Sequence, residues 1–445
     1  MRPGRLYAIG VVLALAVPSA AHATVPLPTS DPFYDVPAHI AGLPNGTVLA
    51  SRPITAYAGP VPLPAQSWEV KYKTIGNLGQ PTATVTTIMV PDAPWSGAGP
   101  RPVVSYQTAE DGVGSVCSPS YALHAGLAAG GSNSEEETSE MAVTLARGWA
   151  VIAPDYEGPR SDFLGAAGEA HGVLDGVIAA QHFKPDGFAL HAPVALWGYS
   201  GGAYATSLAA QLQPTYAPKL RLAGIALGGE PASLEATFAA FNGGVFGGGI
   251  IVGFIGMNRA YPNWDLDRFL NAKGLALMAA NQNDCINNAV ADYPFLSAAP
   301  YMSSPGVLDS KPFVTDLDRA SPLFVPGTPS VPVYDYHATG DELAPIGADR
   351  ELVARYCAAG VRVDHVEIPV GEHETTVATG APGALQYLSD RFAGEPAPDT
   401  CPAGSAKKTV PTGAKQTHTR YRERKRRRHS SRRRRNRSKR GRRRS

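Results

Sequence analysis

LWGYSGGAY, residues 196–204, is the stretch that decides how the rest of the chain is interpreted. It places Ser200 between Gly198 and Gly202, in the pattern Gly-X-Ser-X-Gly. In a nucleophile elbow this pattern sets a serine on a sharp strand-to-helix turn, and the glycines let neighbouring segments approach closely. The alternative is a glycine-rich turn that happens to contain a serine. The apolar run VALW before the pattern and AYATSLAAQL after it predict a strand and then a helix, which favours the elbow.

Strand-like and helix-like segments alternate on both sides of this stretch. Strands are expected at 102–107, 149–155, 194–198, 222–229, 331–337 and 361–370, and helices at 138–147, 168–183, 202–213, 346–358 and 375–392. Ahead of them, residues 67–74 and 82–90 alternate and are rich in β-branched residues, which predicts an antiparallel strand pair. The pattern predicts an α/β fold with a mostly parallel central sheet and helices on both faces.

Two late loops carry residues that could activate the serine, in the chain order serine, acid, histidine. HATGDELAP places Asp341 just past the strand at 331–337, and GEHETT places His373 just past the strand at 361–370. Because ligands bind at the carboxyl edge of such sheets, both residues should meet Ser200 there. The neighbouring Glu342 is an alternative acid that the sequence leaves open.

Other titratable residues near these loops are given structural interpretations. Asp335 lies inside its strand, so its side chain should face a helix layer. His337 precedes Asp341, which is the wrong order for the base, and is expected to shape the acid loop. For the tetrahedral intermediate, one backbone donor should be the N–H of Gly201 and the other should come from the loop TAEDG, 108–112. The Asp111 side chain is expected to hold that loop, unless the loop is simply a solvated turn.

About a hundred residues separate the strands at 222–229 and 331–337. They include an uncharged run from Ala236 to Asn258 that is long enough to span a membrane. Its seven glycines argue against a transmembrane helix. We therefore expect no transmembrane span but an inserted subdomain, at about 230–325, that covers an apolar site.

The N-terminus predicts export. Arg2 and Arg5 precede a short apolar run, and the small residues Ala21 and Ala23 predict a signal peptide over 1–23, cleaved after Ala23. In an oxidising compartment two disulfides are expected, with the pairing open, or else free thiols. The four cysteines, which show no zinc-binding spacing, are Cys117, Cys285, Cys357 and Cys401.

The net charge of +2 conceals an uneven distribution. Residues 406–445 hold 20 of the 40 Lys and Arg but only one of the 38 acidic residues, so the body is acidic and the tail basic. Such a tail cannot bury a core and is expected to be disordered. It could bind anionic surfaces through counterion release and associate the protein with a cell surface, or be an inert segment open to proteolysis. With Tyr421 as its single aromatic residue, it offers no platform for stacking nucleic-acid bases.

Several segments together resemble the secretory lipase family, typified by fungal lipase A and also found in actinobacteria. They are DPFYDVP, SYQTAED, CSPSYAL, VIAPDYEGP, WGYSGGAYAT, HATGDELAP and GEHETTVATGAPGALQYLSDRFAG, spread over residues 31–395. The resemblance implies an α/β-hydrolase fold for residues 24–405, with a helical cap inserted at about 230–325. The glycine-rich run in that cap predicts a flexible cap. An actinobacterial-type member is expected.

The family's catalytic serine, aspartate and histidine fall on Ser200, Asp341 and His373, and its oxyanion donors fall on Gly201 and Asp111. Its two disulfides imply the pairs Cys117–Cys285 and Cys357–Cys401. The leading hypothesis is a secreted, extracellular hydrolase of lipid esters that works through an acyl-enzyme and needs no metal or cofactor, with the cap contacting the lipid interface. The alternatives are an esterase for short-chain or acylated natural-product esters, and a polyanion-binding protein that acts through its tail without specific nucleic-acid recognition.

Overall fold

A central nine-stranded sheet organises the part of the chain that the computed structural model describes, residues 25–130 and 132–403. The predicted signal peptide and basic tail lie outside these residues. The strand order is β1-β4-β5-β7-β6-β8-β9-β10-β11. The strands from β7 to β11 in this order are parallel, whereas β1, β4 and β5 form an antiparallel edge. The mostly parallel sheet predicted from the alternation is confirmed.

The strand boundaries follow the apolar runs of the sequence closely. The expected antiparallel pair is β4 and β5, and the parallel strands keep the expected order along the chain. The bounds are β1 Val48–Ile54, β4 Ala65–Ile75, β5 Pro81–Pro91, β6 Val103–Gln107, β7 Ala150–Pro154, β8 Val194–Tyr199, β9 Leu222–Gly228, β10 Val333–Ala338 and β11 Val363–Ile368. The short strands β2, Tyr57–Ala58, and β3, Val61–Pro62, pair separately.

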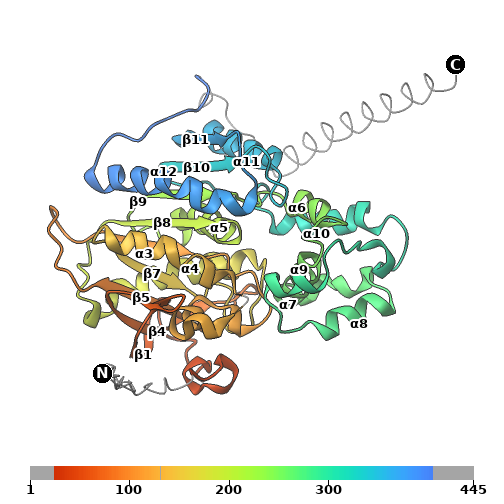
Figure 1. Ribbon diagram of the computed structural model, residues 1–445, viewed down its shortest axis with the longest axis horizontal. Coiled ribbons are helices and arrows are strands. Elements are labelled where there is room, and N and C mark those ends of the chain that lie inside the picture. The colour runs from red at the N-terminus through yellow and green to blue at the C-terminus, as the bar shows by residue number, and fades with distance from the viewer. Residues whose placement is uncertain (1–24, 131, 404–445) are drawn as a thin grey trace, which may run out of the picture.

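Helices cover both faces of the sheet (Figure 1). On one face pack α4, Ala166–His182, α5, Gly201–Tyr216, and α11, Ile346–Ala358. On the other pack α3, Thr138–Ala146, and α12, His373–Ala393. The shorter α1, Pro119–Ala125, and α2, Asn133–Glu136, follow β6.

Residues 229–332 form a helical insertion between β9 and β10, gathered at one end of the sheet (Figure 1). Its helices are α6, Leu234–Phe241, α7, Gly249–Ala260, α8, Ala272–Ala280, α9, Ile286–Asp292, and α10, Lys311–Ala320. In the described residues no helix is both long and apolar enough to cross a membrane. The uncharged run instead supplies most of α7, whose side chains are buried.

The glycines of this run have a packing role that the sequence did not indicate. A Cβ on Gly248 would stand 1.9 Å from the carbonyl oxygen of Ala289 in α9, and one on Gly256 would stand 2.5 Å from that of Phe163. Both distances are far too short, so these glycines allow the cap backbone to approach its neighbours. The glycine content therefore reflects close packing, and flexibility is not needed to explain it.

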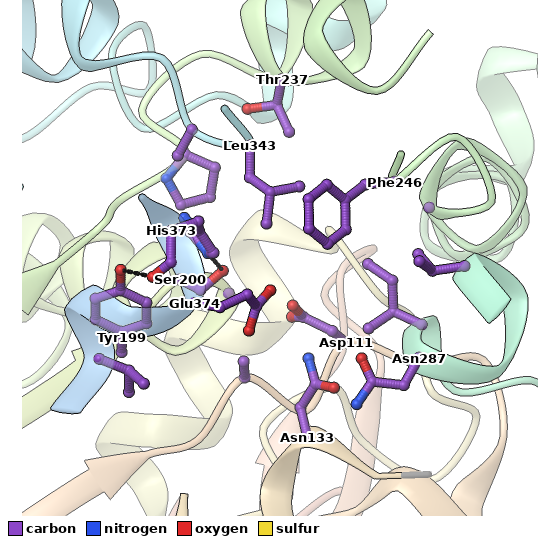
Figure 2. Close-up of a pocket in the computed structure, with 18 of the residues that line it drawn as sticks. Asp111, Asn133, Tyr199, Ser200, Thr237, Phe246, Asn287, Leu343, His373 and Glu374 are labelled. Atoms are coloured by element: carbon purple, nitrogen blue, oxygen red, sulfur yellow. Dashed lines mark hydrogen bonds between the residues drawn. The ribbon is translucent and has the colours of Figure 1, made fainter. Parts of the chain in front are cut away.

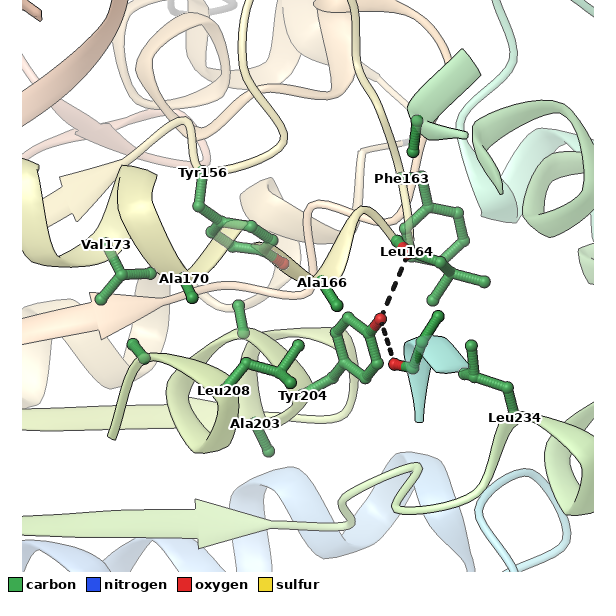
Figure 3. Close-up of a cluster of buried hydrophobic side chains, with 14 of the residues drawn as sticks. Tyr156, Phe163, Leu164, Ala166, Ala170, Val173, Ala203, Tyr204, Leu208 and Leu234 are labelled. Carbon is green, nitrogen blue, oxygen red and sulfur yellow. Dashed lines mark hydrogen bonds between the residues drawn. The ribbon is translucent and has the colours of Figure 1, made fainter. Parts of the chain in front are cut away.

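The core between α4 and α5 continues into the cap (Figure 3). Tyr204 of α5 is fully buried, and its hydroxyl donates to the carbonyl oxygens of Ala320, at 2.8 Å, and Leu164, at 3.2 Å. Two disulfides, Cys117–Cys285 and Cys357–Cys401, pair as the resemblance implies. The first bond and the backbone bridge between Gly112 and Cys285 join the loop after β6 to the cap.

Candidate active site

The Gly-X-Ser-X-Gly pattern forms a sharp turn between β8 and α5. Ser200 has φ 52° and ψ −121°, a strained conformation for a residue with a side chain. Its N–H donates to the carbonyl oxygen of Gly228, at 2.9 Å, which fixes the turn to β9. A Cβ at Gly202 would stand 1.9 Å from the carbonyl oxygen of Gln107, so the glycine lets α5 begin directly against β6. The turn that the sequence predicts is therefore present.

His373 begins α12, and its Nε2 lies 2.7 Å from the Ser200 Oγ. Its backbone is held from two sides: the Tyr199 hydroxyl donates to its carbonyl oxygen, at 2.5 Å, and its N–H donates to Glu342 Oε2, at 3.2 Å. Glu372 caps the helix by accepting from the N–H groups of Glu374 and Thr375. The imidazole is thus set at the helix N-terminus by contacts from β8 and from the acid loop.

Asp341 lies in the loop after β10, and its Oδ2 is 2.8 Å from His373 Nδ1. Its Oδ1 accepts two backbone N–H groups, from Leu343 at 3.0 Å and from Ala344 at 2.6 Å. Of the two acids that the sequence left open, Glu342 contacts the backbone of His373, whereas Asp341 contacts its ring. The structure therefore brings Ser200, Asp341 and His373 into one chain of hydrogen bonds.

His337 supports the acid from beneath, as the sequence suggested. It is fully buried, and its Nε2 contacts the carbonyl oxygen of Ala344, at 2.7 Å, and Asp341 Oδ2, at 3.4 Å. Burial opposes its protonation, but the carboxylates of Asp349 and Asp341 outweigh burial and raise the pKa of His337 to about 10. Burial also raises the pKa of Asp341, yet hydrogen bonds from His337 and His373 leave that pKa well below its ordinary value.

Behind His337 lies a group of side chains with the spacing of cation ligands. Asp335, Asp349 and His365 offer ligand atoms that lie within 4.8 Å of one another. In this structure the His365 Nδ1 contacts the Asp335 carboxylate directly. Burial opposes protonation of His365, but contact with Asp335 raises its pKa to about 9, and burial raises the pKa of Asp349 to about 7. His365 and Asp349 can therefore balance charge within this group by holding protons. The Asp335 side chain lies close to Asp349 of α11 and so faces a helix layer, as expected.

The loop after β6 is buried, so the solvated-turn interpretation is wrong. Two glutamates hold it. Glu137 accepts from the Ala109 N–H, at 2.6 Å, and Glu110 accepts from the Ser118 hydroxyl, at 2.9 Å. The Asp111 carboxyl was expected to hold the loop, but its Oδ1 has no hydrogen-bond partner among the described residues. Instead, Oδ1 stands against Gly201, where a Cβ would be only 1.7 Å away.

The loop after β6 lies against the start of α5 and is bound to the cap through its backbone. Asp111 has φ 35°, and its carbonyl oxygen accepts from the Ile286 N–H of the cap, at 2.9 Å. The two residues predicted as oxyanion donors, Asp111 and Gly201, therefore lie next to each other. Burial raises the pKa of Asp111 to about 7.

A cavity of about 280 Å³ opens over Ser200. Apolar side chains line one part of it: Leu234, Phe238, Phe241 and Phe246 from the cap, and Phe163 and Leu164 from the segment before α4. In Figure 2, Leu343 and Phe246 lie in the upper part of the lining, whereas Asp111, Glu374, Asn133 and Asn287 lie in the lower part. The cavity thus has an apolar end and a polar end, and Ser200 borders both.

Three polar residues that contact the site or line it were not predicted from the sequence: Tyr199, Glu137 and Glu374. Adjacency to Ser200 and His373 was the one available signal for Tyr199 and Glu374. For Glu137 there was none, because 28 residues separate it from the loop that it holds.

Known proteins resemble this chain along most of its length. The model of the secretory lipase family matches residues 124–400. Lipase A of Moesziomyces aphidis is 30% identical over 87% of this chain and 86% of its own length. The crystal structure of Candida antarctica lipase A superposes with a TM-score of 0.76 at 29% identity, covering 89% of this chain and 92% of that one.

One further relative shows why the geometry matters as well as the family. A probable inactive lipase from Mycobacterium tuberculosis is 33% identical over 84% of this chain and 84% of its own length. Membership alone therefore does not decide which residues act, whereas the hydrogen-bonded serine, histidine and aspartate described above bear on that question. With the α/β-hydrolase fold and the family match together, the chain belongs to the secretory lipase family and is a lipase-type carboxylic ester hydrolase.

Proposed function

We propose that this protein is a secreted serine hydrolase that cleaves carboxylic esters of lipids through an acyl-enzyme, with Ser200, His373 and Asp341 as its triad. The observation that carries this proposal is the chain of hydrogen bonds from Ser200 Oγ to His373 Nε2 and from His373 Nδ1 to Asp341 Oδ2. It lies beneath a cavity with an apolar end, which suits an acyl chain.

In the first half of the reaction, Ser200 Oγ attacks the ester carbonyl carbon while His373 Nε2 takes the hydroxyl proton. Asp341 holds the ring with Nδ1 protonated and stabilises the imidazolium that forms. Collapse of the tetrahedral intermediate breaks the bond to the alcohol oxygen, and His373 returns the proton to that oxygen. Water then attacks the carbonyl carbon of the acyl-enzyme while His373 Nε2 takes one of its protons. Collapse of this second intermediate breaks the bond to Ser200 Oγ, His373 returns the proton to that oxygen, and the carboxylic acid leaves.

The developing oxyanion needs donors that are already in place. We assign this role to the backbone N–H groups of Gly201 and Asp111. The first N–H of a helix has no partner within the helix, and Gly201 is the first residue of α5. The position of Asp111 against Gly201 supports the second assignment.

Labelling with a fluorophosphonate, followed by mass spectrometry, tests the nucleophile. We expect the adduct on Ser200, and we expect Ser200→Ala to lower kcat by about 10⁴-fold or more. Ser96→Ala, in an exposed loop, is the matched control. An adduct elsewhere, or wild-type activity in Ser200→Ala, would exclude this mechanism.

The length of the acyl chain is tested separately. The apolar cap residues favour medium or long chains, because each buried methylene contributes roughly 0.8 kcal/mol. A series of p-nitrophenyl esters from acetate to palmitate should therefore show kcat/KM rising beyond butyrate. Activity confined to acetate and butyrate would support the alternative, a short-chain or natural-product esterase.

Export and surface contact complete the proposal. Its support is the secretory family and the signal-peptide pattern, and N-terminal sequencing of secreted protein should begin at Thr24. For the basic tail we propose binding to anionic surfaces, and for the cap a contact with the lipid interface. Deleting 406–445 should weaken binding to anionic vesicles and reduce its salt dependence. Unchanged binding would dismiss the tail as an anchor.

A further inference from the structure

The polar end of the cavity over Ser200 is strongly acidic. Five carboxyl residues line the cavity; besides Glu137 and Glu140 these are Asp111, Glu136 and Glu374, which form what we call the acidic wall. They come from the loop after β6, from α2 and from α12, and burial, with a smaller effect of the Glu374 carboxyl, raises the pKa of both others. Among the described residues that line the cavity there is no lysine or arginine. When these groups are ionised, the wall therefore carries a negative charge that no lysine or arginine of the described lining balances.

Asp111 is the member of the wall that demands an explanation. Its side chain is 5% exposed, and Oδ1 has no hydrogen-bond partner among the described residues. Figure 2 shows its carboxyl directed toward that of Glu374, with Asn133 and Asn287 beside them. Burying a carboxyl oxygen without a hydrogen-bond partner is costly, so its presence in a folded protein needs an explanation, and one such explanation is a ligand that the oxygen contacts.

The wall lies where the alcohol part of an ester should be, a step that rests on the proposed function. His373 Nε2 must protonate the leaving oxygen, so the alcohol departs beside the imidazole. Glu374 follows His373 directly, at the start of α12. The acyl chain takes the apolar end under the cap, which leaves the polar end for the alcohol.

We propose that the acidic wall binds a positively charged alcohol group, such as the quaternary ammonium of a choline ester. Charge complementarity favours a cation over a neutral polyol, because no lysine or arginine of the described lining competes for the carboxylates. Asn287 supports the geometry, since its Nδ2 donates to Glu136 Oε1, at 3.0 Å, and keeps that carboxyl at the wall. The wall would also disfavour anionic alcohol groups.

A pair of isosteric esters tests the proposal in the full-length enzyme. Butyrylcholine and 3,3-dimethylbutyl butyrate share an acyl group and differ in the charge of the alcohol part. The readout is the ratio of their kcat/KM values at pH 8 and low salt. We expect the wild-type enzyme to prefer the choline ester about fivefold or more, and Glu374→Gln to reduce that ratio about fivefold, as for an exposed charge pair. Adding Glu136→Gln to Glu374→Gln should reduce the ratio further.

Glu395→Gln, an exposed substitution beyond the end of α12, is the matched control and should leave the ratio unchanged. A wild-type ratio near one, or a ratio in Glu374→Gln equal to that of the wild type, would overturn the inference. Hydrolysis of the neutral ester in that case would still support the proposed function. A preference for glycerol monobutyrate over butyl butyrate, with a choline ratio near one, would also overturn it by assigning the wall to hydroxyl groups. Hydrolysis of neither ester would contradict the proposed function itself.

Discussion

Replacing Asp111 by asparagine should make the protein more stable at alkaline pH and no different at acidic pH. Asparagine has the same shape, and it tolerates the positive φ of 35° at this position. The backbone N–H proposed for the oxyanion is retained. What changes is the ability of a buried side chain to ionise, so the comparison isolates the cost of that charge.

The magnitude follows from the pKa of Asp111, which burial raises from an ordinary 3.8 to about 7. That difference corresponds to about 4 kcal/mol. Because the folded state holds the proton more tightly than the unfolded state, stability is fully present below about pH 4. It falls as the pH rises toward 7, where the folded protein must also ionise. His373 favours the ionised form, and the acidic or phenolic groups that oppose it are Glu374, Glu137, Glu157, Glu169 and Tyr156.

Thermal unfolding measured at pH 4 and pH 8 provides the assay. With roughly 2 cal/mol/K of unfolding entropy per residue, 4 kcal/mol in a body of roughly 380 residues corresponds to about 5 °C in Tm. Asp111→Asn should therefore exceed the wild type by about 5 °C at pH 8 and match it at pH 4. The exposed Asp92→Asn should show no such pH-dependent difference. If the Tm of Asp111→Asn differs from that of the wild type by the same amount at both pH values, folding does not raise the pKa of Asp111.

Three further perturbations test other parts of the structure. His337→Phe removes a buried cation among carboxylates and should lower the free energy of unfolding by about 3–5 kcal/mol, measured by urea unfolding. In steady-state kinetics the same variant should lower kcat by a larger factor than it raises KM. Replacing Cys117 and Cys285 together by serine should lower the free energy of unfolding by about 2–4 kcal/mol and lower the temperature at which the enzyme is inactivated. Equal inactivation temperatures would show that the disulfide does not hold the cap in place. Gly248→Ala should cost about 1–3 kcal/mol because its Cβ meets the cap backbone, whereas Gly347→Ala in α11, with open space around it, should be neutral or stabilising.

The central sheet was predictable because its parallel strands are nearly continuous apolar runs. Strands of this kind are buried on both faces, and their carboxyl ends share one edge. Ser200, Asp341 and His373 could therefore be placed together from the positions of three strands, although 141 and 32 residues separate them along the chain. Strand order and loop position carried the prediction, and no contact had to be known.

The edge strand β1 escaped prediction for the opposite reason. Val48–Ile54 contains Arg52 and Pro53 and has partly exposed side chains, so neither alternation nor an apolar run marks it. Its pairing with β4 decides its structure, and the Arg52 guanidinium reaches Glu69 across that pair, at 2.5 Å. An edge strand tolerates proline because one side of its backbone lacks a partner.

The support of the oxyanion loop could not be predicted for a related physical reason. A buried loop must satisfy its backbone donors, but any polar side chain that reaches it can do so. Glu137 and Glu110 perform this task, and a composition or spacing rule would not have chosen them over Asp111. Asp111 instead lines the cavity with its Oδ1 unpartnered among the described residues, so its function has to be argued from the site.

The two ends of the cavity separate two kinds of selectivity. The cap, packed through Gly248 and Gly256, sets the space available to the acyl chain, whereas the acidic wall faces the alcohol. Ser200 lies between them, and the groups that line the two ends come from different elements. Changes at sites that share no partner combine nearly additively. A cap substitution should therefore change the ratio of kcat/KM for long and short acyl chains by the same factor in the wild type and in Glu374→Gln. If that factor depended on Glu374, both ends of the cavity would hold the same part of the substrate.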